Sequence, residues 1–337
     1  MIFDYRAYIY DKLRLLGKVN FYRIINYIGI QISYNLSRIL KKPLLWSYPF
    51  SLNFETSSAC NLRCPECMTG MNKTIRQRKL MDSSLLKEKL NIHKKHAFYC
   101  NLYFQGEPFL HPEIYEMIKM VHSSGLYTVI STNGHFLNKP NCLKIIDSGL
   151  DRLIVSLDGI DADAYNQYRI NGIFDKVVDG IRTMAVSKKK TGKNNPILVV
   201  QMLVNKTNEG QVEAAKKFIK QLGADMLEFK SMQIYSETGK EKFIPVDGKY
   251  NRYPNRQDQS FDGKNNQGAC FRLWSHAVYT SDGIMVPCCY DKKPEYGVNG
   301  KEEYSGKNLW KSKSMQTFRY RQLKKVNRPK ICYNCKQ

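Results

Sequence analysis

The stretch SLNFETSSACNLRCPECM, residues 51–68, places three cysteines directly after a strand-like run. Residues 51–57 are short, partly apolar and bounded by polar residues, which predicts a β-strand. Cys60, Cys64 and Cys67 follow at spacings of four and three residues, so their thiols share one short loop. Because cysteine thiolates are the ligands of iron-sulfur clusters, this loop predicts a metal centre at the end of the strand. A zinc site would need a fourth ligand, and the nearest candidates lie beyond a predicted helix.

Strand-like and helical patterns alternate after residue 51. Strands are predicted at 51–57, 101–106, 127–133, 152–159, 197–205 and 226–232. Helices are predicted at 82–95, 112–123, 140–148, 161–168, 174–188 and 209–222. This alternation indicates an α/β protein with a parallel sheet and an active site at the carboxyl ends of its strands. Since six βα units are too few to close an eight-stranded barrel, we expect an open, partial (β/α)6 TIM-like barrel whose open side something else covers.

A second group of cysteines lies near the end of the chain. Residues 277–286, AVYTSDGIMV, predict a hairpin that turns at Asp282-Gly283, and residues 307–326 predict a helix. The cysteines of this region are Cys270, Cys288, Cys289, Cys332 and Cys335. Without an export signal, metal binding or catalysis is favoured over disulfides. Four thiolates can close a 4Fe-4S cube, whereas three leave one iron open. A zinc ribbon on Cys270, Cys288, Cys332 and Cys335 remains an alternative, and Cys100 and Cys142 are expected to be buried as small apolar side chains.

The first cysteine loop is followed by further motifs at consecutive strand ends. They are YFQGEP with Gly106 and Glu107, STNG with Ser131 and Asn133, and SLDG with Ser156 and Asp158; Arg169, in YNQYRINGIFD, comes after the next predicted helix. In this order, and after CxxxCxxC, they resemble the radical S-adenosylmethionine (radical SAM) superfamily over most of the chain. There, three cysteines hold a 4Fe-4S cluster, and the methionine moiety of S-adenosylmethionine chelates the open iron.

The resemblance implies roles for individual residues. Gly106 and Glu107 would bind the methionine amino group, Arg169 would meet the carboxylate, and the serine, asparagine and aspartate side chains would line the cofactor site. Two positions depart from the pattern. Gln105 stands where a glycine is common, and Glu66 replaces an aromatic residue that helps to seat the adenine. We expect Glu66 to keep only backbone contacts with the adenine.

The C-terminal region resembles a SPASM domain in its shortened, single-cluster form, called twitch. GIMVPC, residues 283–288, matches the glycine-four-cysteine signature, which favours Cys288 over Cys289 as a ligand. The resemblance implies an auxiliary 4Fe-4S cluster held by Cys270, Cys288, Cys332 and Cys335. The predicted domains are a helical extension (1–48), the barrel (49–235), a linker (236–268) and the auxiliary-cluster domain (269–337).

The N-terminal region predicts a basic amphipathic helix over residues 21–40. Its apolar residues recur at helical spacing and are Phe21, Ile24, Ile25, Ile28, Ile32, Leu36, Ile39 and Leu40. One interpretation is peripheral contact with an anionic membrane, with the tyrosines and Trp46 at the interface. The other is packing of the apolar face on the barrel or on a second subunit. With no signal peptide and no run of about 18 apolar residues, we expect a cytoplasmic protein.

Net charge adds a constraint on partners. Lys and Arg number 53 against 30 Asp and Glu, giving +23, which favours anionic partners or reflects a solvated, lysine-rich surface. The basic residues form no recognisable nucleic-acid module, so no specific nucleic acid is expected. A non-catalytic, zinc-stabilised scaffold that binds nucleic acid remains the alternative from another class.

The resemblance implies a reaction type. An external donor such as flavodoxin or ferredoxin would reduce the open cluster, and cleavage of S-adenosylmethionine would give a 5'-deoxyadenosyl radical that takes a substrate hydrogen. An auxiliary cluster suits net oxidation. Our first hypothesis is that the substrate is a sugar, an aminocyclitol or an envelope-glycan precursor. Peptide maturation, an activating enzyme, and a radical methyltransferase or lyase are alternatives. An alcohol oxidation also needs a base, for which Lys230, His276 and Asp291 are candidates.

Overall fold

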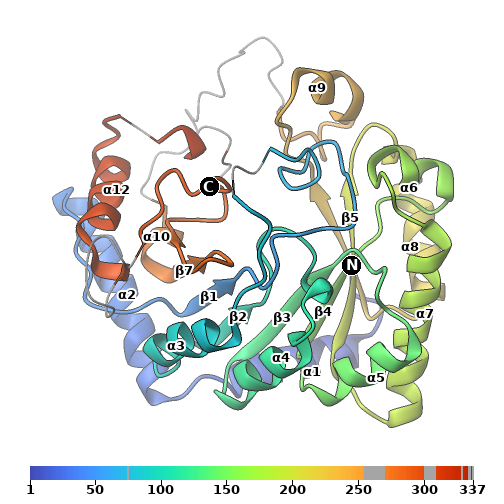
Figure 1. Cartoon of the computed structure of the whole chain (residues 1–337), viewed down its shortest axis with the longest axis horizontal. Coiled ribbons are helices and arrows are strands. Elements are labelled where there is room, and N and C mark those ends of the chain that lie inside the picture. The colour runs from blue at the N-terminus through green and yellow to red at the C-terminus, as the bar shows by residue number, and fades with distance from the viewer. Residues whose placement is uncertain (74–75, 254–269, 300–308, 328, 333–334, 336–337) are drawn as a thin grey trace.

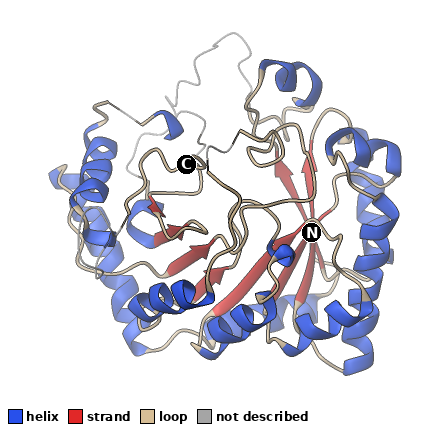
Figure 2. Cartoon of the chain, viewed as in Figure 1, coloured by secondary structure: helices blue, strands red, loops and turns tan. Residues whose placement is uncertain are grey.

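The computed structural model describes residues 1–73, 76–253, 270–299, 309–327, 329–332 and 335. Within them, eight strands form one sheet in the order β6-β5-β4-β3-β2-β1-β7-β8 (Figures 1 and 2). The strands are β1 (Ser51–Phe54), β2 (Tyr99–Asn101), β3 (Tyr127–Thr132), β4 (Arg152–Ser156), β5 (Ile197–Val204), β6 (Met226–Ser231), β7 (His276–Tyr279) and β8 (Met285–Val286). Neighbours from β6 to β7 are parallel, and β8 is antiparallel to β7. The predicted open, partial barrel is confirmed, with two further strands at one edge.

Helices cover the outside of the curved sheet (Figure 1). They are α3 (Ser83–His93), α4 (Ile114–Ser123), α5 (Lys139–Asp147), α6 (Ala162–Tyr168), α7 (Phe174–Thr191) and α8 (Val212–Gln221). Single-turn helices occur at η1 (Pro108–Leu110), η2 (Glu209–Gln211), η3 (Leu309–Lys311) and η4 (Lys330–Cys332). Leu198, Val200 and Met202 of β5 are fully buried beneath the helices. Cys100 and Cys142 are also fully buried in this core, as predicted.

The N-terminal helix α1 (Tyr5–Leu16) packs on the opposite, inner face of the sheet. Ile197 and Val199 alternate along β5 with the residues of the outer face, and they belong to a cluster that includes residues of α1. Buried Asp11 accepts hydrogen bonds from Tyr127 and Arg152 of the sheet. The chain's own N-terminal segment therefore fills part of the space that six βα units leave open.

The second helix, α2 (Phe21–Leu40), has the predicted bounds but presents the opposite face to the protein. Its buried residues are polar or small, apart from one isoleucine: Arg23, Asn26, Ile30, Ser33 and Ser37. The Arg23 guanidinium donates to the carbonyl oxygens of Gly125 (2.6 Å) and Lys94 (2.9 Å). The interpretation in which the apolar face packs on the barrel is therefore wrong.

None of the helices in the described part of the chain has the length and hydropathy that crossing a membrane requires.

The C-terminal segment continues the barrel sheet. β7 pairs with β1 over four residues, from Ser51 opposite His276 to Phe54 opposite Tyr279. The predicted hairpin is confirmed, and Gly283 in its turn has φ of +83°, a conformation that glycine adopts without strain. Helix α10 (Arg272–Ser275) immediately precedes β7, and helix α12 (Lys313–Lys324) comes after the hairpin. Phe318 of α12 packs with Trp274 of α10 and with Ile30 of α2.

Three sequence predictions differ from the structure. The second strand is β2 at Tyr99–Asn101, because residues 103–106 leave the sheet as a loop against the cysteine segment. The predicted linker contains helix α9 (Glu237–Phe243), capped by the Ser236 hydroxyl, which accepts a hydrogen bond from the Gly239 N–H. Residues 254–268 of that linker and residues 307–308 of the predicted C-terminal helix lie outside the described residues. The remainder of that helix is η3 and α12.

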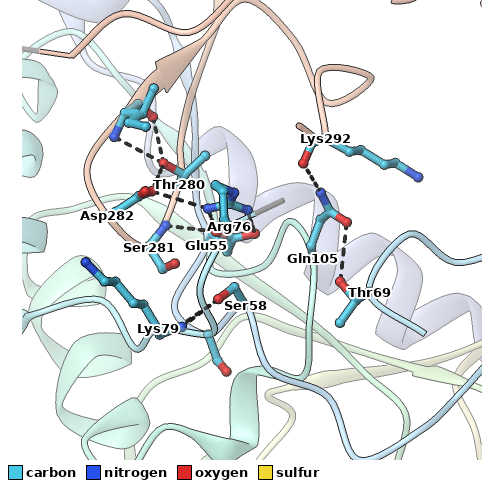
Figure 3. A network of polar contacts seen from close by, with 12 residues as sticks. Glu55, Ser58, Thr69, Arg76, Lys79, Gln105, Thr280, Ser281, Asp282 and Lys292 are labelled. Atoms are coloured by element: carbon cyan, nitrogen blue, oxygen red, sulfur yellow. Dashed lines mark hydrogen bonds and ion pairs between the residues drawn. The ribbon is translucent and has the colours of Figure 1, made fainter. Parts of the chain in front are cut away.

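Glu55, directly after β1, joins three segments of the chain (Figure 3). Its fully buried carboxylate accepts two hydrogen bonds from the Arg76 guanidinium, at 2.7 and 2.8 Å, and one from the Ser281 N–H at 2.8 Å. Arg76 also lies 3.3 Å from Asp282 in the hairpin turn. Glu55 therefore fixes the hairpin to the segment that follows the cysteine loop.

We predict that Glu55→Gln destabilises the fold by about 3–5 kcal/mol, because it leaves the enclosed Arg76 charge without its carboxylate. The measurement is the midpoint of urea unfolding followed by tryptophan fluorescence. Glu213→Gln is the control, since Glu213 pairs with Lys216 on the surface and its loss should change stability by less than about 0.5 kcal/mol. Equal midpoints for the two variants would contradict the role given to Glu55.

Candidate active site

The three N-terminal cysteines lie on the loop at the carboxyl end of β1, as predicted. They pack in one cluster with Leu62 and Tyr168. Two hydrogen bonds shape the loop: the Leu62 N–H points to the Cys60 sulfur at 3.4 Å, and the Cys67 N–H donates to the Cys64 carbonyl at 3.2 Å. The sequence CNLRCPEC thus turns three thiols toward one region of the barrel mouth.

The environment of these thiols fits an iron-sulfur cluster. Burial raises the pKa of Cys64 to about 12, partly opposed by Arg169, and burial also raises the pKa of Cys60. Cys60 and Cys64 therefore lose their protons only when a metal binds and displaces them. Among the described residues, no three His, Cys, Asp or Glu side chains are placed to hold one metal ion. A 4Fe-4S cube does not need such convergence, because each thiolate binds a different iron.

Gly106 brings the loop after β2 against the start of the cysteine segment. Its φ is +72°, and a Cβ there would lie 2.3 Å from the Ser57 carbonyl oxygen and 2.6 Å from that of Ala59. The next residue, Glu107, donates its N–H to the Ala59 carbonyl at 2.7 Å. Only glycine can approach the two carbonyl oxygens this closely. Gly106 is therefore needed, although Gln105 stands where the motif commonly has another glycine.

The Glu107 carboxyl group is buried among hydrogen-bond donors. It accepts from the Thr132 hydroxyl and the Asn133 N–H, both at 2.8 Å, and from the Phe109 N–H at 3.1 Å. Burial raises its pKa to about 7, although these donors act in the opposite direction. The Glu107 carboxyl group is 1% exposed, and its hydrogen bonds offset only part of the effect of burial on its charged form. It is therefore suited to bind an ammonium group, as the resemblance implies.

Arg169 and Asp158 form a buried pair beside the cysteine loop. The Arg169 Nε donates to Asp158 Oδ2 at 2.6 Å, and the other carboxylate oxygen accepts the Leu203 N–H at 2.7 Å. An Nη atom of Arg169 lies 4.0 Å from the Cys64 sulfur. We propose that Asp158 orients the guanidinium, whose other N–H groups remain directed toward the cysteine site for a carboxylate ligand.

Three further predicted residues end up on the inner face of the sheet. Ser131 lies two residues after Val129, and Ser156 two residues after Ile154, so both point inward at the carboxyl ends of β3 and β4. The Asn133 side-chain amide donates to Asn61 Oδ1 at 2.8 Å and lies 3.9 Å from the Cys60 sulfur. Their predicted contacts with the cofactor remain proposals.

The Glu66 side chain has a different role from the aromatic residue it replaces. Its carboxylate accepts hydrogen bonds from the Tyr235 N–H at 2.5 Å, the Ser236 N–H at 3.2 Å and the Ser236 hydroxyl. Glu66 therefore ties the cysteine loop to the start of α9. The sequence could not show this contact because it joins positions about 170 residues apart.

The four C-terminal cysteines gather at a second site. Burial raises the pKa of Cys288, with further upward contributions from the neighbouring Cys289, Cys332 and Cys270 sulfurs, and Cys335 contributes likewise at Cys270. The Cys289 sulfur accepts a hydrogen bond from Arg272 at 3.4 Å, and the Cys288 sulfur accepts one from the Tyr290 N–H at 3.4 Å, so the glycine-four-cysteine spacing is what favours Cys288. We therefore propose Cys270, Cys288, Cys332 and Cys335 as ligands of the auxiliary cluster.

Two residues between the cysteine sites were missed by the sequence analysis. Tyr235 has a buried hydroxyl group with no hydrogen-bond partner among the described residues, and its electrostatic neighbours include Cys67 and Cys289. The Lys292 ammonium lies 4.7 Å from the centre of the Tyr235 ring and has the same two cysteines as neighbours. Figure 3 shows Gln105 joining the Lys292 carbonyl, at 2.9 Å, to Thr69 of the cysteine segment, at 3.3 Å. No sequence motif marks either residue.

The candidate bases of the sequence analysis lie in other surroundings. Lys230 is half exposed and pairs with Glu228 at 3.0 Å. His276 begins β7, at the end of the strand away from the cysteine loop, and burial lowers its pKa to about 4. Asp291 accepts the N–H groups of Glu295 and Tyr296 within a turn. None of the three is positioned like Lys292.

We predict that binding of S-adenosylmethionine weakens about tenfold for each pH unit below about 7, because only the ionised Glu107 carboxylate attracts the methionine ammonium. Anaerobic isothermal titration calorimetry across this pH range is the measurement. Glu107→Gln should bind weakly at every pH, and Glu113→Gln, an exposed residue, should behave as wild type. An unchanged pH profile in Glu107→Gln would contradict this role.

We also predict about eight irons per reconstituted chain, for two 4Fe-4S clusters. Cys60→Ser/Cys64→Ser/Cys67→Ser and Cys270→Ser/Cys288→Ser should each retain about four, because each removes one site. Cys142→Ala, in the core, should keep the full content. Iron and sulfide analysis after anaerobic purification measures this, and zinc without iron would support the scaffold alternative.

Comparison with known proteins agrees with this geometry. Residues 54–219 match the radical SAM superfamily, and residues 270–336 match the SPASM iron-sulfur cluster-binding domain. The tungsten-containing aldehyde ferredoxin oxidoreductase cofactor-modifying protein of Pyrococcus furiosus is 27% identical over 179 residues, 52% of this chain and 49% of that protein. GTP 3',8-cyclase of Limosilactobacillus fermentum is 31% identical over 150 residues, 42% of this chain and 43% of that protein. The chain thus spans about half the length of the curated relatives it matches.

Two solved structures share the fold. SuiB of Streptococcus suis, bound to precursor peptide SuiA, aligns with a TM-score of 0.59 and 14% identity, over 81% of this chain and 67% of SuiB. BtrN in complex with AdoMet and 2-DOIA aligns with a TM-score of 0.51 and 17% identity, over 86% of this chain and 94% of BtrN. At these identities the likeness concerns the fold alone. The two family matches show that this chain belongs to the radical SAM superfamily, with a 4Fe-4S cluster and S-adenosylmethionine as cofactors of the barrel and an auxiliary iron-sulfur cluster in its SPASM domain.

Proposed function

We propose that the protein is a radical SAM oxidoreductase that oxidises an alcohol of a sugar, aminocyclitol or envelope-glycan precursor. The observation that carries this proposal is the position of Tyr235 and Lys292 between the two cysteine sites. A substrate held there would be near both cofactors. When bound, these cofactors supply an acceptor for a substrate hydrogen atom and an acceptor for the remaining electron.

The side chains around this position suit a hydroxylated substrate that carries negative charge. The buried Tyr235 hydroxyl can donate to a substrate oxygen, and the Lys292 ammonium can donate to hydroxyl or phosphate oxygens. Arg252 donates to the Tyr290 hydroxyl at 2.7 Å and adds a second positive charge beside the site. Donors and cations, with aromatic rings between them, are what a polyol phosphate or nucleotide sugar requires.

Lys292 is also the best-placed proton acceptor. Burial lowers its pKa, with the Cys67 and Cys289 sulfurs acting in the opposite direction. A lowered pKa makes it easier for the Lys292 ammonium to release its proton, and the amine that forms can accept the proton of a substrate hydroxyl. Oxidation of the alcohol to a ketone then balances: one hydrogen atom leaves the carbon, one proton goes to the base, and one electron goes to the auxiliary site.

The comparisons support a small substrate and leave a second candidate. BtrN, of which this chain covers 94%, is in complex with 2-DOIA, whereas SuiB, of which it covers 67%, is bound to a precursor peptide. The likeness to SuiB favours peptide modification as the second candidate function. The single-cluster form predicted for the C-terminal region supports the first.

We predict that reduced enzyme makes a product two hydrogens lighter than its substrate, with one 5'-deoxyadenosine per turnover. Mass spectrometry of phosphorylated polyols and nucleotide sugars, incubated anaerobically with dithionite, tests this. Lys292→Met should lower kcat/KM at least about 100-fold because it removes both a ligand and a proton acceptor. Compared with Lys292→Met, Lys292→Arg should recover more of the substrate affinity than of the turnover. Lys230→Met is the matched control. Oxidation of a peptide alone would favour the second candidate.

A further inference from the structure

The outward face of α2 is predominantly apolar, with Asn35 as an exposed polar residue on it. The large apolar residues exposed on it, with their exposed fractions, are Phe21 71%, Ile24 46%, Ile25 52%, Ile28 50%, Ile32 46%, Ile39 74% and Leu40 55%. They lie opposite the buried residues Arg23, Asn26, Ile30, Ser33 and Ser37. From Phe21 to Ile39 this apolar stripe is about 27 Å long, at 1.5 Å per residue. Single exposed apolar residues are ordinary, but a continuous stripe of this kind marks an interaction surface.

Helix α1 extends this surface. Its exposed residues Tyr5, Ile9, Leu13 and Leu16 follow each other at helical spacing, with exposed fractions of 69%, 56%, 61% and 64%. Only four residues, 17–20, separate α1 from α2. Both helices lie against the amino ends of the strands. Arg14 pairs with Asp151, just before β4, and Arg23 reaches the carbonyl of Gly125, just before β3. The two helices and their exposed stripes therefore lie near the same end of the barrel.

The charge of this region is predominantly basic, since the only acidic residues of α1 and its N-cap are Asp11, which is buried, and Asp4. Between Lys12 and Phe54 the sequence contains no Asp or Glu, and its basic residues are Lys12, Arg14, Lys18, Arg23, Arg38, Lys41 and Lys42. Lys12, Arg38, Lys41 and Lys42 are exposed, and so are Lys94 and Lys95, beside the start of α2. Exposed aromatic residues accompany them, with Tyr22 at 59% and Trp46 at 56%. Apolar residues flanked by lysine, arginine and interfacial aromatics form the pattern of a helix that lies in a bilayer surface.

We propose that α1 and α2 form a docking surface for an anionic lipid bilayer. The apolar stripes enter the headgroup region, and the flanking lysine and arginine side chains contact lipid phosphates. The polar inner stripe of α2 holds the helix to the protein through Arg23 and through Asn26, whose side chain exchanges hydrogen bonds with Tyr48 at 2.9 and 3.0 Å. This division explains why an amphipathic helix carries its polar residues inward.

The orientation follows from the same contacts. Because both helices cover the amino ends of the strands, the cysteine loop at the carboxyl end of β1 faces away from the bilayer. The enzyme would be held at the membrane with its mouth toward the aqueous side. A soluble substrate then reaches the mouth directly, and docking localises the enzyme without carrying lipid into the site.

Vesicle sedimentation of the full-length, reconstituted protein tests the proposal. Wild type should bind vesicles of phosphatidylcholine that contain phosphatidylglycerol, and should bind phosphatidylcholine alone much more weakly. Ile25→Glu/Ile28→Glu/Ile32→Glu should abolish binding while leaving iron content and reductive cleavage of S-adenosylmethionine unchanged. The matched control, Ile173→Glu/Val186→Glu/Val246→Glu, changes three equally exposed residues elsewhere and should bind as wild type.

A charge variant separates the two contributions. Lys41→Gln/Lys42→Gln should weaken binding to the anionic vesicles about 25-fold, about fivefold for each charge, and added salt should have a similar effect. Light scattering of the free protein measures its oligomeric state. A dimer that the three glutamates dissociate, without vesicle binding by wild type, would overturn the proposal in favour of a second copy. Equal binding to neutral and anionic vesicles, or a monomer that binds neither, would also overturn it.

Discussion

The pairing of β7 with β1 is the constraint on which both cysteine sites depend. β1 leads into the loop of Cys60, and β7 leads through the hairpin to Cys288, so four residues of parallel pairing fix the distance between the two sites. Glu55 then secures this edge with a buried contact to Arg76 and the hairpin turn. Because parallel strands end at the same edge of a sheet, the C-terminal domain is brought to the mouth of the barrel rather than attached at a distance.

The barrel mouth is built from buried polar groups that hold one another in place. Asp158 orients Arg169, and the backbone around Asn133 orients Glu107, before any ligand arrives. A carboxyl group and a guanidinium group arranged in this way present opposite charges to the two ends of an amino-acid moiety. Such preorganisation costs stability, since each group is withdrawn from water. The hydrogen bonds to backbone N–H groups recover part of that cost.

Much of the fold and the barrel site could be predicted from local patterns. Strands β1 and β3 to β6 follow their predicted starting residues, and the motifs at their ends converge because parallel strands align their carboxyl ends. The predictions failed where long-range contacts decide the outcome. Residues 103–106 leave the sheet because Gly106 must approach the Ser57 carbonyl, and α9 forms where Glu66, far earlier in the chain, meets Tyr235. Lys292 and Tyr235 carry no motif, so only their positions reveal them.

The amino-acid sequence by itself determined the chemistry: three thiols on one loop, five near the end of the chain, a glutamate and an aspartate that follow strands, and an arginine that follows a helix. It also determined that the second helix is amphipathic. Which face of that helix points to solvent was decided by the tertiary structure, because Arg23 finds buried carbonyl oxygens at the barrel while the isoleucines find no partner surface among the described residues. Spacing along a chain fixes which side chains share a face, but the surroundings of that face arise only when distant segments pack.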